Sequence, residues 1–233
     1  MSNHKSRITN HGFFVTGTDT GVGKTLVACS LLRAFANRGF KVAGMKPVAS
    51  GAVPRAGGLV HDDVEKLIAA GNADVPREHV NPYCFEPPVA PHIAAAGAGM
   101  RIDLDRIGRS YDALAARADV VVVEGIGGFR VPLGPGIDTA QLAARLALPL
   151  VLVVGLRLGC LNHALLTAEA AAHRGLELAG WVANHVDPQM AAAEENVRAL
   201  ETLIGAPLLA RIAFTASPDI AAGAALFDTR LLD

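Results

Sequence analysis

The sequence lacks an excess of charge of either sign, with 21 lysines and arginines against 22 aspartates and glutamates. A near-neutral chain gives no electrostatic reason to expect a nucleic acid or an anionic membrane as a partner. Long apolar runs are missing too, because Asp119 and Glu124 bracket the longest stretch of valines. No segment is therefore predicted to cross a membrane, and a small molecule is the expected partner.

Cysteine is scarce and scattered, with Cys29, Cys84 and Cys160 far apart along the chain. No pair has the short spacing of a zinc site, and an odd number of isolated thiols fits a reducing compartment. Residues 1–11 are polar and lack the apolar core of a secretory signal peptide. These features predict a soluble protein of the cytoplasm.

Apolar residues are abundant, at 51% of 233 residues, and they occur in short runs that alternate with helical patterns. Strands are expected at 13–16, 41–45, 120–123, 150–154, 178–183 and 208–212, and helices at 25–37, 62–70, 104–117, 139–146, 161–173 and 191–203. This alternation predicts an α/β fold, one domain over residues 1–233, with a mostly parallel sheet and helices on both faces. Residues 52–58 and 72–100 lack clear periodicity and are predicted to be loops.

The segment from Gly17 to Thr25 reads Gly-Thr-Asp-Thr-Gly-Val-Gly-Lys-Thr and joins the first expected strand to the first helix. Its glycines let backbone N–H groups turn toward phosphate oxygens, and the helix N-terminus adds partial positive charge. Lys24 is expected to reach the β- and γ-phosphates, and the Thr25 hydroxyl to bind Mg²⁺. Thr18 departs from the strict motif, because it stands where the first glycine belongs. A chance glycine-rich turn is the alternative, but motif and context together predict a P-loop NTPase fold that binds ATP.

Carboxylates at the expected strand and helix ends are candidate metal ligands. Glu124 follows a buried strand and precedes three glycines in four residues, which suggests close approach to a ligand at the carboxyl end of the sheet. It could bind Mg²⁺ directly or through water; the alternative is an ordinary loop acid. Asp62 and Asp63 open a short helix, and spacing alone favours an N-cap over a metal ligand for one of them.

Five segments together resemble the dethiobiotin synthetases. They are 17–25, 46–51 (Lys-Pro-Val-Ala-Ser-Gly), 123–128 (Val-Glu-Gly-Ile-Gly-Gly), 158–163 (Leu-Gly-Cys-Leu-Asn-His) and 180–184 (Gly-Trp-Val-Ala-Asn). The second and fourth are far more specific than the P-loop, which many unrelated ATPases share. The resemblance weakens after residue 184.

The resemblance implies an ATP- and Mg²⁺-dependent ligase that closes a ureido ring on 7,8-diaminononanoate. One amine takes up CO₂ as a carbamate, and ATP phosphorylates the carbamate to a carbamic-phosphoric anhydride. The second amine then closes the ring of dethiobiotin, with ADP and phosphate as the other products. The implied cofactor is Mg²⁺, and ATP is a co-substrate.

The resemblance also assigns roles to residues. Lys24 and Lys46 are the implied catalytic residues, because they supply positive charge around the carbamate and the transferring phosphoryl group. Without the resemblance, Lys46 would be interpreted as a solvated lysine at the end of a strand. The implied Mg²⁺ ligands are Thr25, Asp63 and Glu124. The implied nucleotide-binding residues are Gly21, Val22, Gly23, Lys24, Thr25, Leu26, Asp63, Glu124, Gly125, Gly127, Asn184, His185, Ala213, Phe214 and Thr215. The implied substrate-binding residues are Thr20, Ser50, Gly159, Cys160 and Asn162.

Two asparagines have alternatives that the sequence leaves open. Asn162 lies in the first turn of an expected helix, where free N–H groups can receive a carboxylate. The resemblance places this receptor on the neighbouring subunit of a homodimer with shared active sites; otherwise Asn162 only caps its own helix. Asn184 is expected to contact adenine through its amide, and the alternative is a turn residue. Gly21 stands where some members of the family carry Glu, so a role of that carboxylate does not transfer.

Two other functions remain as alternatives. A cobyrinate-type amide ligase needs an ammonia source, usually a fused glutaminase domain, and the segment after Asn184 is too short for one. A partitioning-type ATPase typically has a lysine ahead of the last P-loop glycines, where this chain has Asp19. ATP turnover that depends on the diamine would separate the three functions.

Overall fold

A computed structural model describes residues 12–232 of the chain. Its centre is a parallel six-stranded sheet with the strand order β12-β11-β10-β1-β7-β2. In chain order the strands are β1 (Gly12–Gly17), β2 (Val42–Met45), β7 (Val120–Glu124), β10 (Leu150–Leu156), β11 (Leu178–His185) and β12 (Leu208–Ile212). The predicted α/β fold with a parallel sheet is confirmed. Residues 1–11, for which the sequence predicted no signal peptide, lie outside the described part.

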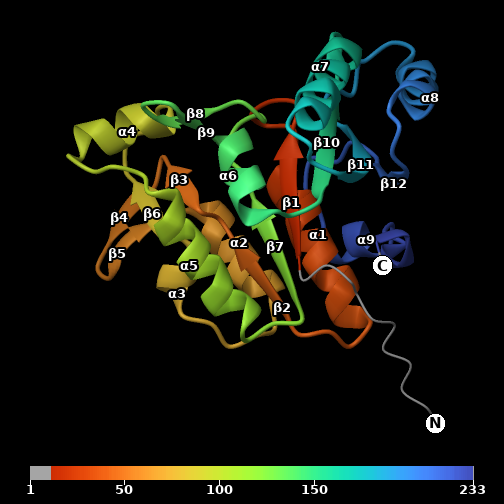
Figure 1. The fold of residues 1–233 in the computed structure, drawn as a ribbon. Helices are drawn as coiled ribbons and strands as arrows, with labels where there is room; N and C mark the ends of the chain where they lie inside the picture. The colour runs from red at the N-terminus through yellow and green to blue at the C-terminus, as the bar shows by residue number, and fades with distance from the viewer. Residues whose placement is uncertain (1–11, 233) are drawn as a thin grey trace.

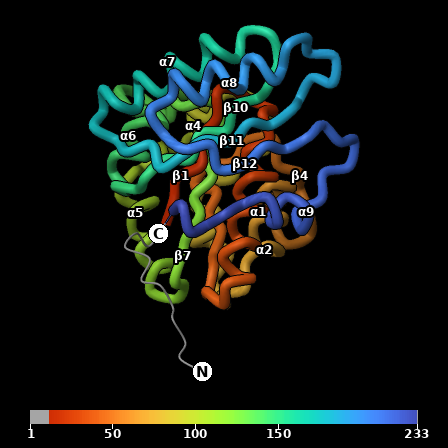
Figure 2. The backbone as a smooth tube through the Cα atoms, turned by 90° about the vertical axis from the view of Figure 1, so that its right-hand side faces the viewer, coloured from red at the N-terminus to blue at the C-terminus, as the bar shows by residue number. Residues whose placement is uncertain are grey.

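Helices cover both faces of the sheet, as expected (Figure 1). One face packs against α1 (Lys24–Asn37), α2 (Asp62–Ala70) and α9 (Ile220–Ala224), and Figure 2 shows α9 lying along α1. The other face packs against α5 (Leu104–Ala115), α6 (Thr139–Leu146), α7 (Cys160–His173) and α8 (Ala193–Leu203). Strand residues alternate between the two cores, since Leu150 contacts the second layer and Val151 the first.

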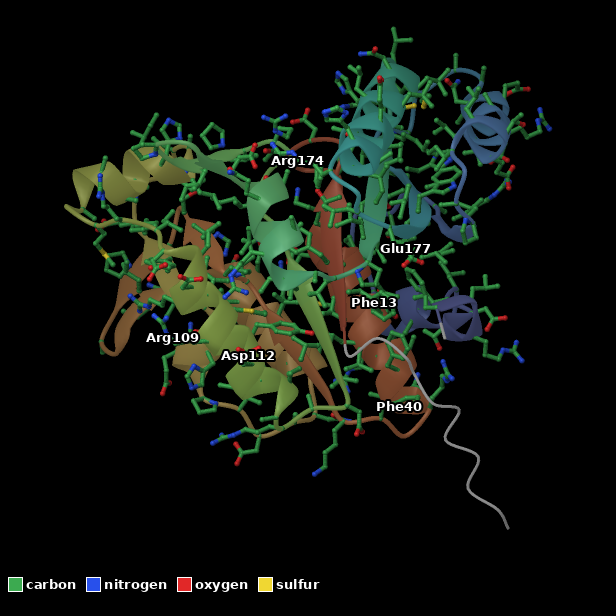
Figure 3. The ribbon with its side chains drawn as sticks, in the orientation of Figure 1. Phe13, Phe40, Arg109, Asp112, Arg174 and Glu177 are labelled. Atoms are coloured by element: carbon green, nitrogen blue, oxygen red, sulfur yellow. The ribbon has the colours of Figure 1, made fainter. Side chains whose placement is uncertain are left out.

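Helix α5 illustrates why the sequence forms these layers. Ile107 and Leu114, seven residues apart, are fully buried against the sheet, whereas Arg109 and Asp112 are exposed (Figure 3). This spacing gives one apolar face to an α-helix. The Asp103 side chain accepts a hydrogen bond from the Asp105 N–H and satisfies one free donor at the helix start.

The two segments predicted to be loops contain regular structure, so this expectation was wrong. Residues 52–58 enter an antiparallel hairpin of β4 (Val53–Arg55) and β5 (Gly58–Val60). Residues 72–100 contain α3 (Arg77–Val80), β6 (Tyr83–Phe85) and α4 (Pro91–Gly97), and β6 pairs with β3 (Val48–Ser50). These elements have three to seven residues, which is too short to show a hydrophobic period.

The remaining short elements are β8 (Pro132–Gly134), β9 (Ile137–Asp138) and the 3₁₀ turn η1 (Thr229–Leu232). Among the helices of residues 12–232, none combines the length and apolar character needed to cross a bilayer.

Candidate active site

The P-loop connects β1 to α1 at the carboxyl edge of the sheet. Gly21 and Gly23 both have left-handed backbone conformations, with φ of 74° and 91°, which glycine adopts without a steric penalty. A Cβ at Gly23 would lie 2.2 Å from the Asn184 Nδ2 atom. That same amide nitrogen donates a hydrogen bond to the Val22 carbonyl over 2.8 Å. The tight turn is therefore held in place by the end of β11.

Lys24 turns back toward its own loop. Its ammonium donates to the Asp19 carbonyl over 2.9 Å, and the Asp19 carboxylate pairs with Arg157, which follows β10. Burial, followed by the repulsion of the Lys46 ammonium, lowers the pKa of Lys24 from 10.5 to about 8. An anion that entered this loop would relieve both effects, which is the behaviour expected of a phosphate-binding lysine.

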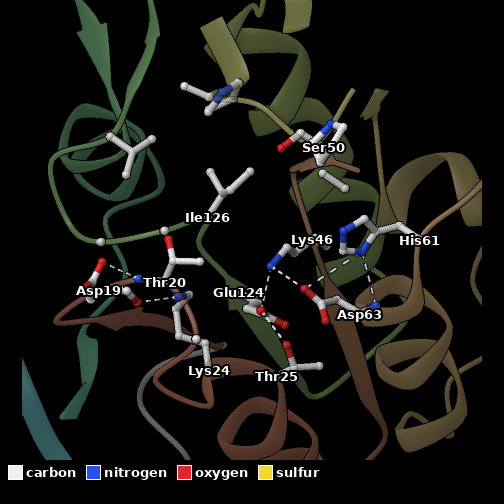
Figure 4. Close-up of a pocket in the computed structure, with 18 of the residues that line it drawn as sticks. Asp19, Thr20, Lys24, Thr25, Lys46, Ser50, His61, Asp63, Glu124 and Ile126 are labelled. Atoms are coloured by element: carbon white, nitrogen blue, oxygen red, sulfur yellow. Dashed lines mark hydrogen bonds and ion pairs between the residues drawn. The ribbon is translucent and has the colours of Figure 1, made fainter. Parts of the chain in front are cut away.

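Lys46 is the centre of a buried polar cluster (Figure 4). Its ammonium lies 2.6 Å from Glu124 Oε1, 3.0 Å from Asp63 Oδ2 and 3.2 Å from the Gly125 carbonyl oxygen. Burial disfavours its charge, but the two carboxylates outweigh burial and raise the pKa of Lys46 above 10.5. The alternative of a solvated strand-end lysine is wrong, because the side chain is only 4% exposed.

Glu124 also accepts a hydrogen bond from the Thr25 hydroxyl, over 2.9 Å to Oε1. Burial alone would raise the pKa of Asp63, but the Lys46 ammonium holds it below its usual range. The other carboxylate oxygen, Glu124 Oε2, is buried and has no hydrogen-bond partner among the described residues. An unpaired buried oxygen of this kind is costly unless a further group binds it.

These residues have the donor set that Mg²⁺ takes in nucleotide sites, which is one or two carboxylates, a hydroxyl and otherwise water or phosphate oxygens. The unpaired Glu124 Oε2 fits such an ion. Within residues 12–232 no group of three or more His, Cys, Asp or Glu side chains could hold a metal by itself. A cation at Asp63 and Glu124 would therefore need ligands from a bound nucleotide or from water.

The cluster and the P-loop line one cavity of about 800 Å³. Predicted residues in its wall are Thr20, Gly21, Gly23, Lys24, Thr25, Lys46, Ser50, Asp63, Glu124 and Gly127. The structure thus brings together both lysines, all three predicted metal ligands and two of the predicted substrate contacts. Val22, Leu26 and Gly125 are adjacent in sequence to wall residues but are not part of the wall.

The other predicted residues lie outside this cavity. Asn184 and His185 end β11, and Asn184 is buried, so the turn alternative for this residue is wrong. Ala213, Phe214 and Thr215 follow β12 and are exposed. Gly159 is the N-cap of α7 and no side chain caps that helix, so the capping alternative for Asn162 is also wrong. Asn162 is exposed, whereas Cys160 is buried.

Sequence reasoning missed several wall residues. His61, rather than Asp62 or Asp63, is the N-cap of α2, and its Nδ1 accepts a hydrogen bond from the Asp63 N–H over 3.2 Å. The expected aspartate cap was wrong because histidine is an unusual cap. The remaining unpredicted wall residues are Asp19, Ala49, Pro88, Val89, Ala90, Pro91, Ile126, Gly128 and Val131. Three prolines close together, at 87, 88 and 91, were the one feature of the sequence that could have indicated one side of the cavity.

Comparisons of the sequence with known proteins agree on one family. A family model described as an AAA domain matches residues 11–218. A protein of Aromatoleum aromaticum named ATP-dependent dethiobiotin synthetase BioD is 54% identical over 213 residues, which are 91% of this chain and 95% of the relative. A protein of the same name from Nitrosospira multiformis is 53% identical over 208 residues, which are 89% of this chain and 90% of the relative.

Comparisons of the structure show the fold alone. A ParA family ATPase from Chlorobium tepidum superposes with a TM-score of 0.52 at 15% identity, over 92% of this chain and 86% of that one. A MinC:MinD cell division protein complex from Aquifex aeolicus gives a TM-score of 0.52 at 14% identity, over 91% and 86% of the two chains. Both agree with an α/β fold of the P-loop NTPase type.

Proposed function

Because the chain belongs to the family of ATP-dependent dethiobiotin synthetases, we propose that it joins 7,8-diaminononanoate and CO₂ through a carbamate in a reaction that needs Mg²⁺. As a member of this family the chain is a ligase of biotin biosynthesis that closes a ring at the expense of ATP. The observation that carries the finer proposal is the single cavity that contains Lys24, Lys46, Thr25, Asp63 and Glu124. It supplies positive charge for anionic reactants and oxygen ligands for a cation.

The proposed reaction has three steps. In the first, one amine nitrogen of the substrate bonds to the carbon of CO₂ and releases a proton, which leaves a carbamate. A carbamate oxygen then attacks the γ-phosphorus of ATP, and the bond to the β-γ bridging oxygen breaks to give ADP. Finally the second amine attacks the carbamate carbon, the bond to the phosphorylated oxygen breaks, and phosphate leaves with that oxygen while the amine gives up one proton to the phosphate. All three steps gather negative charge at one place.

The two lysines would neutralise that negative charge. Lys24 would leave the Asp19 carbonyl and bind the β- and γ-phosphates, which a helix N-terminus and the turned P-loop also favour. Lys46 would contact the carbamate and the transferring phosphoryl group. Preorganised cations that meet developing negative charge are the main source of catalysis in phosphoryl transfer.

A magnesium ion would be held by Thr25, Asp63 and Glu124. When bound, it would neutralise the phosphate oxygens and help to align the γ-phosphate. The hydroxyl of Thr25 and one oxygen of Glu124 already lie 2.9 Å apart, and Glu124 Oε2 is unpaired among the described residues. Both facts support the assignment.

Contacts to the diamine would come from the cavity wall, and contacts to the base would come from residues outside the cavity. Ser50 and Thr20 line it and have hydroxyls that would bind the amines or the carbamate. The base of ATP would lie beyond the P-loop, near Asn184, His185 and residues 213–215. Asn184 donates one N–H to Val22, so its oxygen and second N–H would be the groups that meet adenine.

The carboxylate of the substrate would be bound by a second subunit. Gly159, Cys160 and Asn162 do not line the cavity of their own chain, and Leu158 beside them is 95% exposed. A large exposed apolar side chain next to a free helix start supports a homodimer in which this segment completes the neighbouring site. Each chain, residues 1–233, would then act as one synthetase domain in the cytoplasm.

Incubation of the protein with diaminononanoate, bicarbonate and MgATP tests the proposed function. Mass spectrometry should detect the cyclic urea, and phosphate release should require the diamine. Phosphate release without the diamine and without the urea would favour an ATPase of the partitioning type. Dependence on ammonia or glutamine would favour an amide ligase.

A further inference from the structure

The Lys46 ammonium lies between the two carboxylates that are the proposed metal ligands. It contacts Glu124 Oε1 at 2.6 Å and Asp63 Oδ2 at 3.0 Å, and the Gly125 carbonyl at 3.2 Å completes its surroundings. In Figure 4, dashed lines join the Lys46 ammonium to both acids. One positive charge is thus bound by the same two carboxylates that a small divalent cation would take from this chain.

The ammonium and a divalent cation compete for these two carboxylates. Mg²⁺ binds oxygens at about 2.1 Å, and an ammonium in hydrogen-bond contact with the same carboxylates would face it at close range. Repulsion between like charges is strong in a site that water does not screen. A cation on the unpaired Glu124 Oε2 would still face the ammonium on Oε1 across one carboxylate, so metal binding favours a Lys46 that moves away.

The cavity offers the Lys46 ammonium a second position. Its side chain lines the same cavity as Lys24 and Ser50, where the proposed function puts the carbamate and the γ-phosphate. Four methylene groups let the ammonium change direction without a change of the backbone at the end of β2. Lys24 has a different contact, the Asp19 carbonyl, so the two lysines are not equivalent.

We propose that Lys46 is a built-in substitute for the metal: its ammonium neutralises Asp63 and Glu124 in the metal-free enzyme and is displaced into the reaction cavity when the cation binds. This proposal rests on the proposed function for the positions of the metal, the carbamate and the γ-phosphate. It gives Lys46 a positioning role before catalysis, because the catalytic ammonium is delivered to the reactants only once the metal is in place. Metal binding and anion binding in the cavity then favour each other.

The test uses protein without nucleotide or diamine, so its readout is not activity. Thermal unfolding is followed in EDTA and over a MgCl₂ series for the wild type, Lys46→Met, Lys46→Met/Glu124→Gln and the control Lys66→Met. Lys66 is an exposed lysine of α2. Binding of Mn²⁺ alone, as a spectroscopic probe for Mg²⁺, is measured by electron paramagnetic resonance on the same set.

Lys46→Met should lower Tm in EDTA by roughly 10 °C, because it leaves two carboxylates without their counter-charge. Added Mg²⁺ should restore much of that loss, since a ligand of the native state raises stability. Mn²⁺ should bind Lys46→Met at least about ten-fold more tightly than the wild type, because no ammonium has to be displaced. The double variant should regain Tm in EDTA and lose the response to Mg²⁺, and Lys66→Met should match the wild type.

Equal Tm values in EDTA, or unchanged Mn²⁺ affinity in Lys46→Met, would overturn the proposal. Should Lys46→Met fail to fold, the wild type supplies the test through reductive methylation followed by mass spectrometry. Lys46 should be methylated faster with Mg²⁺ than with EDTA, while the methylation rate of Lys66 should be the same in both. An equal methylation rate of Lys46 in the two conditions would contradict its displacement by the metal. If the urea forms but the changes in Tm, Mn²⁺ affinity and methylation are absent, only the displacement of Lys46 is disproved. If those changes occur but no urea forms, only the proposed reaction is disproved.

Discussion

The Thr25 hydroxyl donates a hydrogen bond to Glu124 Oε1 over 2.9 Å, although 99 residues separate the two in sequence. The contact joins the start of α1 to the carboxyl end of β7. It forms because β1 and β7 are parallel neighbours, with Val15 opposite Glu124, so the loop after one strand lies beside the end of the other. Ligands bind at this edge in open α/β sheets.

Glu124→Gln tests the role of this carboxylate. The amide keeps the size of the side chain but removes the charge that a hard cation prefers. We expect the Mg²⁺ concentration for half-maximal rate to rise by roughly ten-fold or more, with a smaller change in KM for ATP. Steady-state rates over a Mg²⁺ series measure this, and an unchanged Mg²⁺ series would remove Glu124 from the metal site.

Removal of either lysine should reduce turnover strongly. Lys24→Ala and Lys46→Ala each delete a cation that meets the transferring group, and a loss of this kind costs roughly 10²-fold or more in kcat. Circular dichroism at saturating Mg²⁺ checks that the proteins are folded, and Lys66→Ala is the matched control. A wild-type rate for Lys46→Ala would show that its catalytic role is wrong.

Asn162→Ala tests the shared site. Loss of a hydrogen bond to a carboxylate should raise KM for the diamine by roughly ten-fold, with KM for ATP nearly unchanged. At a diamine concentration well below the wild-type KM, a mixture of Asn162→Ala and Lys46→Ala should be more active than either parent, because one of the two sites in a mixed dimer has both side chains. If subunit exchange is verified and the mixture is no more active than its parents, the shared site is disproved.

The Cys29 thiol should make stability fall in alkaline solution. Burial, with help from the Glu124 and Asp63 carboxylates, raises the pKa of Cys29 from 9.0 to about 12. The unfolded chain therefore loses this proton first, so the free energy of unfolding should fall by about 1.4 kcal/mol per pH unit from pH 9 to pH 12. Urea unfolding of the wild type and Cys29→Ala isolates the effect; a constant difference between them over that range would contradict it.

Much of the fold and part of the site could be predicted from the sequence. The P-loop was predictable because its spacing and its strand–helix context occur together, and Glu124 because an acid before glycines ends an all-valine strand. Parallel strands bring their carboxyl ends to one edge, which is enough to expect Lys46 and Glu124 on the same side of the sheet.

The sequence could not show the contacts that depend on strand order and side-chain direction. β2 pairs with β7, and Met45 lies opposite Val123, which places Lys46 beside Glu124 at 2.6 Å. No local pattern encodes that pairing. The same holds for Asn184, whose hydrogen bond to Val22 spans 162 residues, and for His61, whose capping role depends on the ring's direction.

Transfer of oxygen from CO₂ to phosphate tests the carbamate mechanism most directly. In the proposed reaction a carbamate oxygen attacks the γ-phosphorus and remains with phosphorus when the second amine closes the ring. A short reaction of the protein with diaminononanoate, MgATP and ¹⁸O-labelled CO₂ should therefore yield phosphate with one ¹⁸O per molecule of urea formed, measured by mass spectrometry. Phosphate without ¹⁸O, formed together with the urea, would contradict the mechanism.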